Sequence, residues 1–182
     1  EELKESIHEF KKALKINPKC FEAIVNLANC YIKLENYEEA MINYEKAIKL
    51  NPNNAQVFNN YGASLLDRQK IKEAYPLLMK SYKMDPNNVE NLTNLAIASV
   101  KLNNDRQASI NYLEKALKVS HSFDTRTILS YQYFKINKFE KFKELFPSRL
   151  KRPKIRNHRP LNLLKDYSEL KNFKNKNILL YN

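Results

Sequence analysis

The sequence predicts an all-α fold in which antiparallel helix pairs stack into a right-handed superhelical solenoid. A proline preceded by Asn or Asp recurs every 34 residues, at Pro18, Pro52 and Pro86, and small and apolar residues keep the same places between these prolines. The chain also has one glycine in 182 residues. Sandwiches and barrels need many tight turns with positive φ, so this composition disfavours them. A 34-residue period is typical of a helical hairpin repeat.

Each repeat contains two expected helices with different patterns. In the first helix, apolar residues three and four positions apart make one buried stripe, and a small eighth residue lets the second helix approach closely. The second helix has a small, a large and a small residue in fixed places. The first helices contribute Ile24, Leu27, Ala28 and Tyr31, then Phe58, Tyr61, Gly62 and Leu65, then Leu92, Leu95, Ala96 and Ser99. The second helices contribute Ala40, Tyr44 and Ala47, then Ala74, Leu78 and Ser81, then, after one inserted residue near Asn103-Asn104, Ser109, Leu113 and Ala116.

The prolines and the asparagines that follow them mark the ends of the hairpins. The residue before a proline is steered away from helical angles, and an Asn after it can cap the next helix. This pattern resembles the tetratricopeptide family, which implies an array over residues 1–146. Good repeats are expected at 19–54, 55–88 and 89–122.

The two ends of the array depart from the pattern. Residues 1–18 fit the second half of an earlier repeat, which suggests a piece of a longer protein. Residues 123–146 fit a degenerate capping repeat, in which Phe142 replaces a small residue.

The resemblance implies a binding site on the concave wall that the first helices line. Its sixth position is Asn in all three good repeats, and an amide can both donate to and accept from a peptide backbone. This row resembles the peptide-holding groove of O-linked N-acetylglucosamine transferases. The alternative is a solvated polar lining in an Asn-rich chain. We predict backbone contacts from Asn26, Asn60 and Asn94, and specificity contacts from Asn29, Asn59, Glu22, Gln56 and Glu90.

The basic charge is concentrated at the C-terminal end. Residues 1–134 hold 18 Lys or Arg and 16 Asp or Glu, whereas residues 135–182 hold 14 and 4. We interpret residues 147–182 as an irregular basic linker followed by a possible first strand of a missing domain. The run from Arg149 to Arg159 gives one alternative function, contact with nucleic-acid phosphates.

A second resemblance falls on the same segment. Phe146 to Pro153 and Phe173 to Tyr181 are similar to the junction in bacterial proteins that fuse tetratricopeptide repeats to a glycosyltransferase domain. This resemblance implies an alternative function, the substrate-recognition arm of a glycosyltransferase whose catalytic domain lies beyond Asn182.

The remaining residues give no sign of chemistry. There is no catalytic Ser, His and Asp grouping, no glycine loop for phosphates and no Cys pair with zinc spacing, and the three histidines are far apart. No apolar run is long enough to span a membrane. We therefore expect no catalytic residue, metal or cofactor, a protein or peptide partner rather than a membrane or nucleic acid, and by default a cytoplasmic location.

Overall fold

The computed structural model describes residues 2–145, and every regular element in that range is an α-helix. The tail from residue 147 onward, with its predicted linker and strand, lies outside the described residues. The helices are α1 (Glu2–Ile16), α2 (Phe21–Lys33), α3 (Tyr37–Leu50), α4 (Ala55–Asp67), α5 (Ile71–Met84), α6 (Val89–Asn103), α7 (Arg106–Val119), α8 (Phe123–Lys135) and α9 (Phe139–Leu145).

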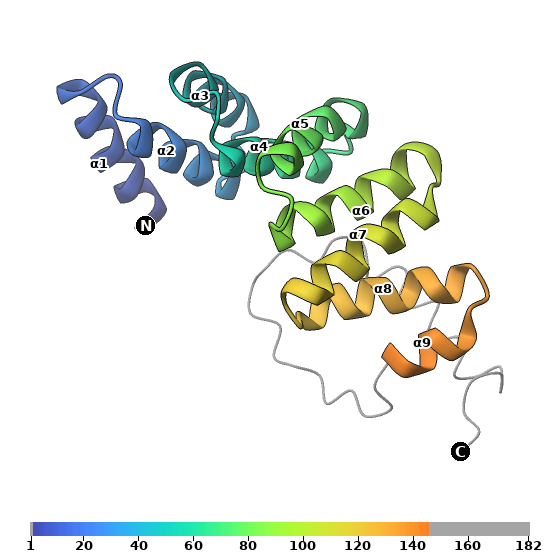
Figure 1. Ribbon diagram of the computed structural model, residues 1–182. Helices are drawn as coiled ribbons and strands as arrows, with labels where there is room; N and C mark the ends of the chain where they lie inside the picture. Colours follow the sequence, from blue (N-terminus) through green and yellow to red (C-terminus); the bar gives the residue numbers. More distant parts are fainter. Residues whose placement is uncertain (1, 146–182) are drawn as a thin grey trace. The chain divides into compact units, whose positions relative to one another are not determined.

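The helices pack in chain order (Figure 1). The pairs α2 with α3, α4 with α5, α6 with α7 and α8 with α9 form hairpins, and the second helix of each hairpin also packs on the first helix of the next. The first helices touch one another as well, α2 against α4 and α4 against α6. The predicted all-α solenoid of stacked helix pairs is confirmed for this part of the chain.

The core of each hairpin lies where the small residue of the first helix meets the large residue of the second. Ala28 and Ala96 are fully buried, and so are Leu78 and Leu113 on the second helices. At Gly62 the fit is tightest, because a Cβ built there would lie 2.7 Å from the Leu78 side chain. This close approach is why the only glycine of the chain stands at this position.

Asparagine and aspartate side chains organise the loops between helices. Asn54, Asn88 and Asp105 cap α4, α6 and α7 by accepting hydrogen bonds from backbone N–H groups at 3.1, 2.8 and 2.9 Å. Before the prolines, Asn17 and Asp85 accept from the backbone N–H two residues later, which closes a local turn.

The degenerate last hairpin has a bulky residue in a small place. Phe142 of α9 is buried, and its ring centroid lies 5.5 Å from that of Phe134 on α8. The ring of Phe142 is thus accommodated in the core of the last hairpin against Phe134.

The turns inside the hairpins place non-glycine residues in the left-handed region. Glu35 and Gln69 both have φ of 60°, and Asn104 has φ of 54°. The inserted residue of the third repeat lengthens α6, so Asn104 lies one position later in its repeat than Glu35 and Gln69 do. Glu and Gln rarely adopt this conformation, whereas glycine adopts it without steric cost.

We expect Glu35→Gly to raise the free energy of unfolding by about 0.5–1 kcal/mol, since it removes the left-handed penalty. Urea denaturation followed by circular dichroism measures the change. Lys46→Gly, in the exposed interior of α3, is the control and should lower the same free energy by about 1 kcal/mol. Equal destabilisation by both changes would contradict the strain at Glu35.

Candidate functional site

Three asparagines occupy the same place on three first helices. Asn26 lies on α2, Asn60 on α4 and Asn94 on α6, each at the sixth position of its repeat. Asn26 is exposed, and the other two are half-buried. Since α4 contacts both α2 and α6, we call Asn26, Asn60 and Asn94 the amide row of one continuous wall.

Two members of the amide row hydrogen-bond to the preceding helix of the wall. The amide of Asn60 donates to Oδ1 of Asn29 on α2 at 3.3 Å, and the amide of Asn94 donates to Oδ1 of Asn59 on α4 at 3.0 Å. Each bond joins the first helices of neighbouring repeats. The row therefore also has a structural role, fixing how successive hairpins pack.

The Asn29 side chain is held from a second side. The Tyr44 hydroxyl donates to the same Oδ1 at 2.7 Å, and burial raises the pKa of Tyr44 well above its usual range, so this hydroxyl stays protonated. With two donors aimed at one oxygen, the orientation of the Asn29 amide is determined. The sequence pattern assigned Tyr44 only to the core and gave no signal for this bond.

Asn26 and Asn60 differ in how much of their hydrogen-bonding capacity remains. The Gln56 amide donates to Oδ1 of Asn60 at 2.7 Å, so Asn60 both accepts and donates within the wall. The Asn26 side chain makes no hydrogen bond to any residue in the described range. Asn26 is thus the member of the row whose amide is fully available to a ligand.

The structure buries one of the predicted specificity residues. Asn59 is 2% exposed and lies between α4 and α6, where its oxygen accepts from Asn94. A ligand on the wall surface has no access to this side chain, so we leave Asn59 out of the proposed contact surface. A side chain at the fifth position points toward the neighbouring helix here, which the repeat pattern alone does not specify.

Of the other predicted specificity residues, Asn29 is half-buried and its Oδ1 is occupied, whereas the remaining three are exposed. Glu22, Gln56 and Glu90 occupy the second position of their repeats and are exposed. Each stands one turn before a member of the amide row. Glu22 and Glu90 lie in the first turns of α2 and α6, where a carboxylate is also stabilised by the helix dipole.

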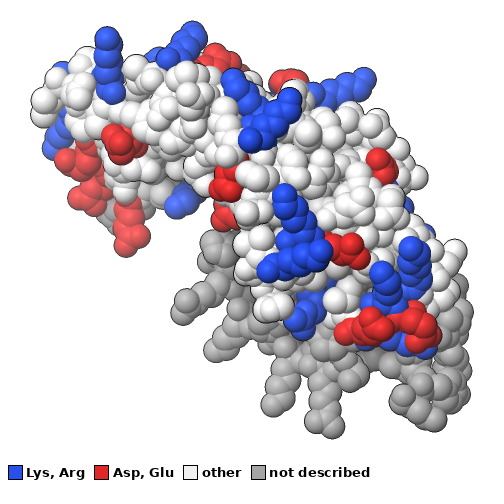
Figure 2. Space-filling model, in the orientation of Figure 1, with Lys and Arg blue, Asp and Glu red and all other residues white. Residues whose placement is uncertain are grey.

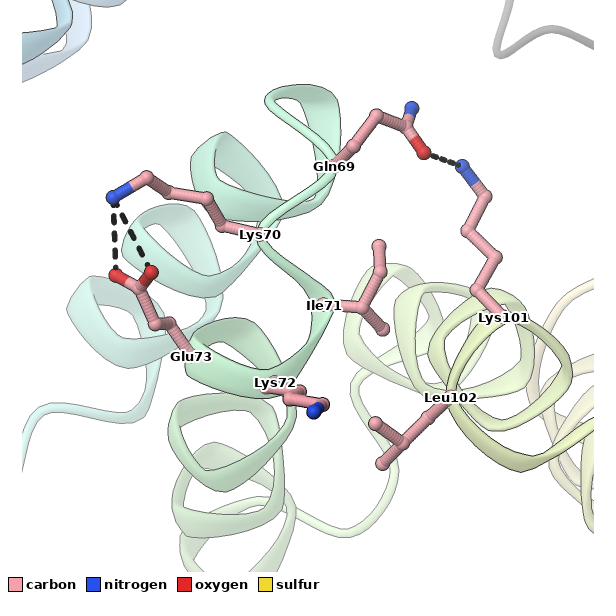
Figure 3. A pocket seen from close by; sticks show the side chains of 7 residues that line it. All are labelled: Gln69, Lys70, Ile71, Lys72, Glu73, Lys101 and Leu102. Atoms are coloured by element: carbon pink, nitrogen blue, oxygen red, sulfur yellow. Dashed lines mark hydrogen bonds and ion pairs between the residues drawn. The ribbon is translucent and has the colours of Figure 1, made fainter.

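A depression of about 380 Å³ opens elsewhere, beside the turn between α4 and α5 (Figure 3). The apolar side chains of Ile71 and Leu102 line it, together with those of Lys70, Lys72 and Lys101. Lys70 pairs with Glu73 at 3.2 Å, and Lys101 donates to Gln69 at 2.9 Å. Most of its polar groups are thus already paired with one another.

The described helices show no grouping typical of catalysis or metal binding. Residues 2–145 contain no set of three or more His, Cys, Asp or Glu side chains that could hold a metal ion. Both cysteines, Cys20 and Cys30, have free thiols, and burial raises the pKa of Cys30. No helix in the described range has the length and apolar character needed to cross a membrane.

The fold and the wall define a helical-hairpin repeat protein. Two models of the tetratricopeptide repeat match the sequence, one over residues 21–54 and the other over residues 43–75. Residues 21–75 therefore match the tetratricopeptide repeat, the family that the sequence pattern resembles. No curated protein matches the sequence significantly.

Several solved structures have the same fold at low sequence identity. A MamA RS-1 double mutant superposes with a TM-score of 0.71 at 19% identity, over 79% of this chain and 81% of the other. PilF of Pseudomonas aeruginosa gives 0.70 at 24%, over 75% and 62%. YrrB, described as a tetratricopeptide protein with an unusual peptide-binding site, gives 0.64 at 21%, over 79% and 74%.

These matches give no support to the suggested link with a glycosyltransferase. The family models and the three structures concern the repeats alone. The residues on which that link and the nucleic-acid alternative depend, from Phe146 to Tyr181, lie outside the described residues.

Proposed function

We propose that the chain is a protein-interaction scaffold whose amide row binds the main chain of an extended polypeptide. The observation that carries the proposal is that one residue type with both a donor and an acceptor occupies the same position on three successive first helices, exposed at Asn26 and half-buried at Asn60 and Asn94. Glu22, Gln56 and Glu90, along the edge of the row, would then select among side chains. YrrB, a tetratricopeptide protein of the same fold, has a peptide-binding site, which agrees with this use of the fold.

The intramolecular bonds of the row support main-chain recognition. Asn60 and Asn94 donate to the preceding helix, which holds their amides in place before a ligand arrives. A fixed amide loses little conformational entropy on binding. No reaction is proposed for the described residues.

Asn26→Ala tests the proposal most directly because Asn26 has no hydrogen bond within residues 2–145 that could be lost with the change. Peptides are first selected from a displayed random library on the whole chain, and one is then measured by isothermal titration. We expect Asn26→Ala to weaken its binding about fivefold, the effect of one hydrogen bond. Asn53→Ala, an exposed loop asparagine, is the matched control and should leave binding unchanged.

The chemistry of the selected peptide provides a second test. If the row reads the main chain, N-methylation of single peptide bonds should weaken binding more than alanine substitution of the same residues. A peptide that binds equally well to the wild type and to the Asn26→Ala and Asn94→Ala variants would refute the proposal.

A further inference from the structure

A second periodic surface lies at the ends of the second helices. The last two residues of α1, α3, α5 and α7 are in every case a lysine followed by an aliphatic or Met residue. We call these residues the lysine edge. They are Lys15-Ile16, Lys49-Leu50, Lys83-Met84 and Lys118-Val119.

The apolar members of the lysine edge are unusually accessible. Val119 is 51% exposed and Leu50 40%, and Met84 is half-buried. Ile16 is 88% exposed, but it lies on α1, which has no hairpin partner among the described helices. Burial in the hairpin cores therefore does not explain these residues. Each stands beside an exposed lysine and just before an inter-hairpin loop, in which Pro18, Pro52 and Pro86 are exposed too.

The four lysines make no hydrogen bond, ion pair or ring contact with any residue in the range 2–145. In the column three residues earlier, three of the four lysines do make such contacts, and the fourth, Lys46, makes none among the described residues. Lys12 pairs with Glu9 at 2.8 Å, Lys80 lies over the Phe58 ring at 4.4 Å, and Lys115 donates to the Tyr82 hydroxyl at 3.2 Å. The lysine edge thus has four unpaired charges, whereas most lysines of the neighbouring column are engaged in contacts.

Nearby acidic groups are already occupied. Glu45 lies one turn before Lys49 and accepts a hydrogen bond from the Tyr61 hydroxyl. Glu114 lies one turn before Lys118 and accepts a hydrogen bond from the Tyr133 hydroxyl. Asp85 follows Met84, and its carboxylate accepts the Asn87 N–H at 3.2 Å. These carboxylates reduce the positive potential of the edge, yet none forms an ion pair with it.

Helix electrostatics explain only part of the pattern. A lysine in the last turn is stabilised by the helix dipole, but that effect does not require a partly exposed apolar residue beside it on α1, α3, α5 and α7. Figure 2 shows basic side chains spread along the drawn face with acidic ones between them, so net charge alone does not mark the edge either. What distinguishes the edge is that an unpaired lysine and a partly exposed apolar residue stand side by side at the same position of each repeat.

We propose that the lysine edge binds an extended acidic polypeptide that carries aliphatic side chains between its carboxylates. Charge complementarity selects the acidic groups, and the exposed apolar residues select the aliphatic ones. The first helices of neighbouring hairpins touch, and packed helices lie about 10 Å apart, so at about 3.3 Å per residue an extended partner needs at least about three residues per hairpin. One lysine on each second helix gives a repeating charge, which a chain with repeating carboxylates can match.

A nucleic acid fits this surface less well than a polypeptide. No arginine and no aromatic ring is present among the eight residues of the lysine edge, so bases have nothing to stack on. The edge shares no residue with the amide row, and this inference does not depend on the proposed function.

The test uses a fluorescent (Glu-Glu-Leu)5 peptide and the whole chain, with binding measured by fluorescence anisotropy at low salt. We expect the quadruple variant of Lys15, Lys49, Lys83 and Lys118 to Gln to weaken binding at least tenfold. Glutamine keeps the helix propensity of lysine, and circular dichroism checks the fold. The control quadruple changes Lys4, Lys33, Lys72 and Lys101 to Gln, removes the same charge from exposed positions, and should change binding less than threefold.

Further measurements separate the edge from the basic C-terminal residues and from other partners. A photo-crosslinking version of the peptide should label residues 15–19, 49–53 and 83–87, and a (Glu-Glu-Ser)5 peptide should bind several times more weakly. Equal loss in both quadruple variants, with labelling confined to residues 135–182, would overturn the proposal. A second result would also overturn it. If the edge variant lost binding to phosphatidylserine vesicles but still bound the peptide, the partner of the edge would be a lipid.

Discussion

Leu78→Ala is expected to lower the free energy of unfolding by about 3–5 kcal/mol. The Leu78 side chain is completely buried at the centre of the second complete hairpin. It packs directly over Gly62, where no Cβ can fill the space that truncation leaves. The loss then includes both the transfer of apolar surface and a residual cavity. Urea denaturation followed by circular dichroism measures it.

Two further variants test the reason for this loss. Leu50→Ala removes the same atoms from a side chain that is 40% exposed, and we expect it to cost less than about 1 kcal/mol. Gly62→Ala should destabilise the wild type, because its Cβ would lie 2.7 Å from Leu78, but should stabilise the Leu78→Ala variant by about 1 kcal/mol through helix propensity. An effect of Gly62→Ala that is equal in both backgrounds would contradict the close contact.

The hairpin cores could be predicted from the sequence because their determinants are local and periodic. A small residue at the eighth position implies a large one facing it from the second helix, and Gly62 with Leu78 shows this pairing in its tightest form. The caps at Asn54 and Asn88 follow from the same period. The left-handed turns at Glu35 and Gln69 do not, because neither residue type favours that conformation.

The wall could be predicted only in part, because its hydrogen bonds join different repeat positions. Asn60 reaches Asn29, at the ninth position of the preceding repeat, whereas Asn94 reaches Asn59, at the fifth. A column of identical residues indicates a shared direction on the helix, but it does not specify which partner each amide meets. Those partners depend on the offset between neighbouring helices, which is set by packing.

The stability of the stack is expected to fall steeply above pH 10, through tyrosines at the junctions between hairpins. Burial, followed by the nearby Glu45 carboxylate, raises the pKa of Tyr61 to about 12, and burial together with Tyr75 raises that of Tyr112 to about 12. The pKa values of Tyr44 and Tyr133 are raised as well, mainly by burial. Tyr61 stacks on Tyr44 with ring centroids 5.5 Å apart.

The direction of the effect follows from proton linkage. An unfolded tyrosine loses its proton near pH 10, whereas these folded tyrosines retain it to higher pH, so the folded state binds more protons in the interval. Their contribution to stability is therefore fully present below pH 10 and is lost as the pH rises through about 12. Free energies of unfolding from urea titrations at pH 8 to 12 should be constant at first and then decline.

The double variant Tyr61→Phe and Tyr112→Phe separates this effect from lysine titration in the same range. Phenylalanine keeps the ring contacts but has no ionisable hydroxyl, so the decline between pH 10 and 12 should become shallower. Absorbance at 295 nm in the wild type should show the buried tyrosines ionising together with unfolding, after the exposed ones. If all the tyrosines ionised near pH 10 while the helices remained folded, the junctions would be open to solvent and the linkage argument would fail.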